Sequence, residues 1–203
     1  MLGYWNKSVY ITYLGAFLAV GGYLVFLTTG NVDYSFLGMI LAAVCDMFDG
    51  KVARSMKNRT DQEKNFGVEI DSLADIICFI AIPALTVYHY GLNNWYQIII
   101  LALYVISGII RLAYFNVAMS DKDKAIKEYK GLPVPMSIFF FGIVWLLTKV
   151  CTLNAALVYT ILVPIVGYLH ISRIKIKKYT GNWFYITVCL VALIGIVLGL
   201  FVL

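Results

Sequence analysis

Seven apolar segments, separated by short polar stretches, constrain this chain more than any other feature of its sequence. A helix needs about 20 mostly apolar residues to cross the hydrocarbon core of a bilayer. Segments close to this length cover residues 9–28, 34–53, 67–89, 95–118, 134–150, 154–171 and 183–202. Only 13% of the 203 residues are charged, whereas a soluble domain has about 25%. The sequence therefore predicts an all-α, polytopic membrane protein, with about seven transmembrane helices forming a single domain over residues 1–203.

Lysine and arginine residues alternate along these segments, and this alternation predicts the orientation of the chain. They precede the first segment and fill every second connection: Lys7; Lys51, Arg54, Lys57, Arg59 and Lys64; Lys122, Lys124, Lys127 and Lys130; Arg173, Lys175, Lys177 and Lys178. The opposite connections contain only Lys149. By the positive-inside rule, the N-terminus and the basic connections face the cytoplasm and the C-terminus lies outside. We expect the basic connections to bind anionic lipid headgroups and not nucleic acid, because no soluble module accompanies the charge.

Four aspartates interrupt the second and third apolar segments close to their predicted cytoplasmic ends. Asp46 and Asp49 fall at i and i+3, and Asp71 and Asp75 at i and i+4, so each pair shares one face of a helix. A charge within a membrane segment costs about 2.5–3.5 kcal/mol, and four like charges repel one another unless cations lie among them. Carboxylate oxygens suit Mg²⁺, Mn²⁺ or Ca²⁺. The pattern predicts a divalent-metal site between two adjacent helices.

Small residues and an arginine accompany these carboxylates. Gly50, Ala53 and Gly67 share the helix faces of the aspartates and leave room for a bulky group against the backbone. Arg54 is always charged, and its guanidinium suits phosphate oxygens. Together with two metal ions, these residues indicate a pyrophosphate site. The alternative is a polar patch between helices, with the glycines allowing close packing.

The two stretches "DMFDGKVAR" and "GVEIDSLAD" resemble the signature of the CDP-alcohol phosphotransferase family, D-x-x-D-G-x-x-A-R followed by G-x-x-x-D-x-x-x-D. Every fixed position is present: Asp46, Asp49, Gly50, Ala53, Arg54, Gly67, Asp71 and Asp75. The spacer over residues 55–66 is longer than is usual in the family, and we expect its extra residues after Thr60, in "DQEKN". The stretch "NKSVYIT", residues 6–12, shows a weaker likeness to the "PNxxT" of relatives.

The resemblance implies a reaction and a site. The reaction is transfer of a phosphatidyl group from CDP-diacylglycerol to an alcohol, with release of CMP. Asp46, Asp49 and Asp71 would hold two divalent ions, with Asp71 bridging them, and Asp75 would be the general base and could also touch a metal. The donor CDP-diacylglycerol would bind at Gly50, Ala53, Arg54, Thr60 and Gly67. The resemblance also suggests a homodimer. The apolar segments and the basic connections predict a multi-pass protein of the cell membrane with its active site facing the cytoplasm.

Further stretches resemble the branch of this family that makes phosphatidylserine, which implies L-serine as the acceptor. They are "DSLAD" followed by "IPA", "RLAYFN" at residues 111–116, and "YKGLPVP" at residues 129–135. Serine carries a carboxylate and needs a cation nearby, so Arg111 and Lys130 are candidates, together with Asn116. Arg111 could instead extend toward the membrane surface at a helix end, and Asn116 could cap its helix. Tyr114 stands where relatives have an arginine.

Other functions remain open at this point. The acceptor could be glycerol phosphate or inositol phosphate within the same family. An intramembrane prenyltransferase also uses paired aspartates and magnesium on a pyrophosphate, but the "DG..AR" element and the short distance between the two motifs argue against it. A cation transporter could use the carboxylates as its ion site. Transporters tend to carry broken helices and internal repeats near the membrane midplane, whereas the aspartates here lie near a predicted cytoplasmic end and no repeat is evident.

Overall fold

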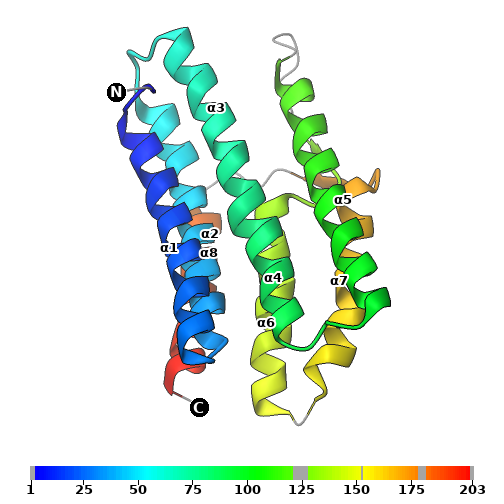
Figure 1. Ribbon diagram of the computed structural model, residues 1–203. Coiled ribbons are helices and arrows are strands. Elements are labelled where there is room, and N and C mark those ends of the chain that lie inside the picture. Colours follow the sequence, from blue (N-terminus) through cyan, green and yellow to red (C-terminus); the bar gives the residue numbers. More distant parts are fainter. Residues whose placement is uncertain (1–2, 121–127, 152, 178–181, 202–203) are drawn as a thin grey trace.

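The computed structural model describes residues 3–120, 128–151, 153–177 and 182–201, and this part of the chain forms a bundle of long helices lying side by side (Figure 1). The helices are α1 (Lys7–Thr29), α2 (Asp33–Ser55), α3 (Asp61–Asp75), α4 (Ile82–His89), α5 (Trp95–Ser120), α6 (Ser137–Val150), α7 (Ala155–Ile171) and α8 (Asn182–Phe201). A π-helical segment (Ile76–Ala81) joins α3 to α4 in one continuous helix, and a 3-10 turn (Val134–Met136) precedes α6. Each apolar segment therefore coincides with a helix, and the helical fold class is confirmed.

One part of the fold differs from a purely helical expectation. Strand β1 (Glu128–Lys130) pairs antiparallel with β2 (Lys175–Lys177) and joins two of the predicted basic connections. Nearby, Gly131 adopts a φ of 76°, and its N–H donates to the carbonyl of Ile174 over 2.9 Å. Backbone groups outside helices need partners, and this pairing supplies them. Lys122, Lys124, Lys127 and Lys178 lie outside the described residues.

Three helices in the described part of the chain are long and apolar enough to cross a membrane: Lys7–Thr29, Asp61–His89 and Trp95–Ala118. Helix α2 is 23 residues long but contains the aspartates and basic residues of the predicted site, and α6 and α7 are shorter apolar helices. Helix α1 begins and α8 ends at opposite ends of the bundle (Figure 1). The full count of seven spans and the cytoplasmic N-terminus stay predictions.

Helices α1 and α2 approach each other more closely than ordinary side chains would allow. A Cβ atom added to Gly22 would lie 2.4 Å from the carbonyl oxygen of Tyr34 and 3.0 Å from the Cα of Gly38. Small residues at helix contacts let backbones meet in this way, which is a common means of association in membranes. The close contact fixes α1 against α2, and it thereby places the N-terminal half of α1 beside the aspartates of α2.

Two polar contacts hold the remaining helices. At the end of α2 opposite the predicted site, Asp33 accepts hydrogen bonds from the indole of Trp145 (2.8 Å) and the ammonium of Lys149 (2.6 Å), both on α6. The imidazole of His170 on α7 lies between the hydroxyls of Ser107 on α5 (3.3 Å) and Ser137 on α6 (2.8 Å). Polar groups buried in an apolar surrounding need such partners, so these contacts specify which helix faces meet.

Candidate metal and nucleotide site

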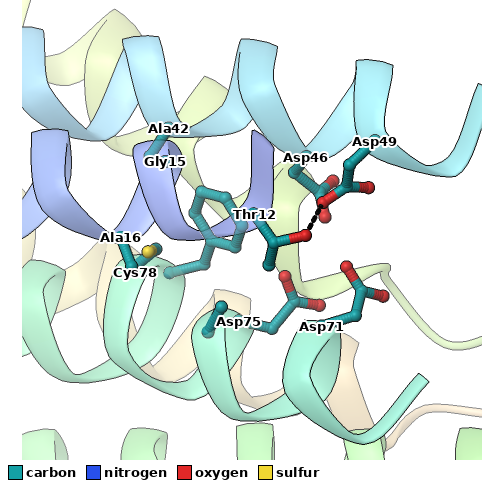
Figure 2. A pocket seen from close by; sticks show the side chains of 11 residues that line it. Thr12, Gly15, Ala16, Ala42, Asp46, Asp49, Asp71, Asp75 and Cys78 are labelled. Atoms are coloured by element: carbon teal, nitrogen blue, oxygen red, sulfur yellow. Dashed lines mark hydrogen bonds between the residues drawn. The ribbon is translucent and has the colours of Figure 1, made fainter. Parts of the chain in front are cut away.

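Four carboxylates from two helices converge on one small cavity. Asp46 and Asp49 reach it from α2, and Asp71 and Asp75 reach it from α3 (Figure 2). One oxygen from each of Asp46, Asp49 and Asp71 lies within 4.8 Å of the other two. Asp49 and Asp75 are buried, and the other two are half-buried. Three hard oxygens at this separation can surround one divalent cation, and the charge of the ion would offset the repulsion among buried carboxylates.

Helix α1 supports this cluster through Thr12, which the sequence analysis did not select. Its hydroxyl donates to Oδ2 of Asp49 over 2.5 Å, and Thr12 is only 7% exposed. The start of α1 is fixed by Asn6, whose Oδ1 accepts from the backbone N–H groups of Ser8 (3.1 Å) and Val9 (3.2 Å). The only signal for these residues in the sequence was the weak likeness of "NKSVYIT" to an N-terminal motif of relatives.

A π-helical segment begins at the residue directly after Asp75 and continues α3 into α4. Phe79, inside this segment, accepts a hydrogen bond on its carbonyl oxygen from the hydroxyl of Tyr104 on α5 (2.8 Å). Gly108, one turn further along α5, leaves room for Ile80, because a Cβ at this position would overlap that side chain. Segments of π-helix are frequent at functional sites. Here the segment and its contacts with α5 hold the end of α3 in place.

The residues predicted to receive the nucleotide lie near the end of α2 and the start of α3. Gly50 and Ala53 are half-buried, and Arg54 is exposed. Thr60 caps α3: its hydroxyl accepts from the backbone N–H of Glu63 (3.2 Å), and the Glu63 carboxylate accepts from the backbone N–H of Thr60 (2.8 Å). The residues after Thr60 form the first turns of α3, so this helix begins six residues before the predicted apolar segment at Gly67; the place of the extra spacer residues stays a prediction. The capping contacts give Thr60 a structural task, and its contact with nucleotide stays a prediction.

The three acceptor candidates contact three different partners. Arg111 is only 6% exposed; its Nε donates to the carbonyl oxygen of Leu132 (3.1 Å), and its guanidinium lies 4.8 Å from the ring centre of Phe115. Its burial contradicts the alternative of an arginine extended toward the membrane surface. Lys130 is exposed and donates to the hydroxyl of Tyr114 (3.3 Å).

Asn116 pairs with Ser72, the residue after Asp71, across the contact between α5 and α3. The side-chain oxygen and nitrogen of Asn116 lie 3.1 and 2.9 Å from the Ser72 hydroxyl. Helix α5 continues to Ser120, so the alternative of a capping role for Asn116 is wrong. The pair places one acceptor candidate beside the helix that carries Asp71 and Asp75.

Comparison with known proteins assigns the chain to a family. A family model described as CDP-alcohol phosphatidyltransferase matches residues 5–171. The chain belongs to this family. The match begins just before α1, contains all four aspartates and Thr12, and ends at the last residue of α7. The family resemblance of the two aspartate motifs is therefore confirmed over most of the chain.

Several curated relatives are similar to the chain. A CDP-diacylglycerol–serine O-phosphatidyltransferase of Saccharomyces cerevisiae is 34% identical over 66% of the chain, and one of Methanocaldococcus jannaschii is 32% identical over 80%. An archaetidylserine synthase of Methanothermobacter thermautotrophicus is 32% identical over 80% of the chain. The aligned parts cover 51%, 74% and 67% of these three relatives. The chain thus spans about half the length of the yeast relative.

Proposed function

We propose that this protein transfers the phosphatidyl group of CDP-diacylglycerol to the hydroxyl of L-serine, giving phosphatidylserine and CMP. The observation that carries the proposal is the convergence of Asp46, Asp49 and Asp71 within 4.8 Å, with Asp75 lining the same cavity, in a member of the CDP-alcohol phosphatidyltransferase family. Serine as acceptor is supported by the relatives whose names specify a serine transferase or an archaetidylserine synthase.

In this proposal, Asp46, Asp49 and Asp71 hold divalent ions, and the family resemblance suggests two such ions. Mg²⁺ or Mn²⁺ is preferred, and Ca²⁺ is a further candidate. When bound, such ions neutralise the pyrophosphate and the charge on the departing CMP. The residues fit this role because their oxygens are hard and lie close together, and because a membrane segment tolerates several carboxylates poorly without a compensating charge.

Asp75 is the proposed general base. Its buried carboxylate lines the cavity beside the other three, where it can accept the proton of the serine hydroxyl as the serine oxygen attacks phosphorus. The phosphorus–oxygen bond to CMP breaks in the same transfer. Gly50, Ala53, Arg54, Thr60 and Gly67 receive the donor, and Arg111, Asn116 and Lys130 are the candidates for binding serine.

The location of the site suits a lipid substrate with a polar head. The acyl chains of CDP-diacylglycerol need the bilayer and its nucleotide needs water, so the reaction belongs near one end of a membrane bundle. The aspartates lie close to the basic connection between α2 and α3, which the positive-inside rule places in the cytoplasm. We infer a multi-pass protein of the cell membrane, a single domain with its site facing the cytoplasm, and we retain the homodimer as a prediction.

A headgroup-transfer assay tests this proposal. Purified protein is supplied with CDP-diacylglycerol and labelled serine, with Mg²⁺, with Mn²⁺ or with a chelator, beside the variant Asp75→Asn. We expect metal-dependent phosphatidylserine and CMP, both lost in the variant. Release of CMP with glycerol phosphate or inositol phosphate but not with serine would support CDP-diacylglycerol as the donor and reject serine as the acceptor. No turnover with any of these alcohols under any metal would reject the transferase.

A further inference from the structure

Two glycines of the site lie in helix interiors where the packing of the described residues does not require them. At Gly22, by contrast, an added Cβ would collide with the backbone of α2. At Gly50, the atoms within 4 Å of an added Cβ all belong to the Arg54 guanidinium, the nearest at 3.3 Å. At Gly67, the nearby atom is Nη1 of Arg59, at 3.7 Å, which is an ordinary contact distance. Glycine destabilises a helix interior relative to alanine, so glycine at these two positions needs a reason other than packing.

Arg59 is placed over Gly67 by the start of α3. It directly precedes Thr60, whose backbone and hydroxyl are fixed by the Glu63 carboxylate through contacts of 2.8 and 3.0 Å. The Glu63 carboxylate also attracts Arg59 electrostatically. The hydrogen bonds of that carboxylate, however, go to Thr60. The space beside Gly67 is thus bordered by a cation held at the helix start.

The Nε of Arg59 is buried and has no hydrogen-bond partner among the described residues. A buried donor without a partner carries a free-energy penalty, and the fold tolerates it where a ligand later satisfies the group. Gly67 lies one helical turn before Asp71, on the same face of α3. The guanidinium of Arg59, next to Gly67, therefore lies beside the face of α3 that carries Asp71.

We infer that Arg59, just before the start of α3, is a second phosphate-binding arginine of the donor site beside Arg54 in the last turn of α2, and that it contacts an anionic oxygen of the cytidine diphosphate group. Arg59 lies outside the eight fixed positions of the family signature. The inference rests on the proposed function, since it takes the donor to be a cytidine diphosphate. A guanidinium forms strong paired hydrogen bonds with phosphate oxygens, and Gly67 leaves the space through which the phosphate reaches it.

The test measures binding of CDP to the purified full-length protein by titration calorimetry in the presence of Mn²⁺. Arg59→Gln removes the charge, Arg59→Lys keeps it, and Lys57→Gln is the matched control, an exposed basic residue of the same connection. We expect the glutamine variant to bind CDP about 10-fold more weakly or worse. The lysine variant should be intermediate, and the control should bind CDP as the unaltered protein does. Stabilisation by Mn²⁺ alone should be equal in all four proteins.

A fourth variant separates a ligand contact from a structural one. Gly67→Ala fits the structure without a clash, so it should keep its melting temperature and still lose CDP affinity. Normal CDP binding by Arg59→Gln would overturn the inference and leave the transferase intact. If Arg59→Gln does not fold, normal CDP binding by both Arg59→Lys and Gly67→Ala would equally overturn it. Failure of the unaltered protein to bind CDP with any divalent metal would instead reject the proposed function.

Discussion

Substitution of Thr12 by valine removes the one hydrogen bond that α1 is seen to donate to the carboxylate cluster. Valine has nearly the shape of threonine, so the packing between α1 and α2 is preserved while the hydroxyl is lost. Thr12 Oγ1 lies 2.5 Å from Oδ2 of Asp49, and both residues are buried. Without the hydroxyl, the Asp49 carboxylate loses a partner that orients it and stabilises its charge.

The size of the effect follows from the geometry. A hydrogen bond to a charged group contributes about 1.5–3 kcal/mol, and solvent does not replace the lost donor at a buried position. Since about 1.4 kcal/mol corresponds to a tenfold change in an equilibrium constant, the affinity for the divalent metal should fall by roughly 10- to 100-fold. Loss of a hydrogen bond to a metal-binding side chain has effects of this size in other proteins.

The assay is the dependence of transfer activity on Mn²⁺ concentration, together with the Mn²⁺-induced rise in melting temperature. We expect both curves of Thr12→Val to shift to higher metal concentration, and Thr12→Ser to restore them in large part. Thr28→Val is the control, because Thr28 is exposed near the other end of the same helix and bonds only the carbonyl of Val25 among the contacts seen. An unshifted metal curve for a folded Thr12→Val protein would refute the role of Thr12.

Three further predictions concern packing, the polar contact at the far end of the bundle, and the acceptor. Gly22→Ala should lower the free energy of unfolding by about 1–3 kcal/mol, because the added Cβ clashes with the backbone of α2. Gly21→Ala, whose added Cβ meets no described atom within 4 Å, should be neutral or stabilising. Equal melting temperatures of the two variants in detergent would contradict the close α1–α2 contact. Asp33→Asn should destabilise the protein by about 1–3 kcal/mol, because it weakens a partly buried, charged hydrogen bond with Lys149. It should leave CDP affinity unchanged, and a loss of CDP affinity would show that the two ends of the bundle are coupled. Arg111→Gln should raise the KM for serine about tenfold or more at unchanged CDP affinity, and an unaltered KM would remove Arg111 from the acceptor site.

Much of the candidate site follows from residues close together in the sequence. Asp46 and Asp49 share a helix face because their separation matches the helical repeat, and the same is true of Asp71 and Asp75. The charge pattern of the signature could therefore be recognised without a structure. The convergence of the two pairs was an expectation from the sequence, and the distances in the structure now support it.

Contacts between distant residues were not predictable in this way. Thr12 is separated from Asp49 by 37 positions, and Ser72 from Asn116 by 44. No local pattern says which face of α1 meets α2, because this depends on where small residues such as Gly22 allow the backbones to approach. The pairing of β1 with β2 and the π-helical segment after Asp75 likewise arise from tertiary contacts.

The sequence by itself determined the helical class, the positions of the helices and the family, because apolar segment length and motif spacing are local properties of the chain. Tertiary structure alone decided which side chains support the carboxylates and which cation covers Gly67. The physical reason is that a hydrogen bond, or the contact of a guanidinium with a glycine, depends on distances of a few ångströms between segments. Those distances are set by the packing of the entire bundle, which no single segment encodes.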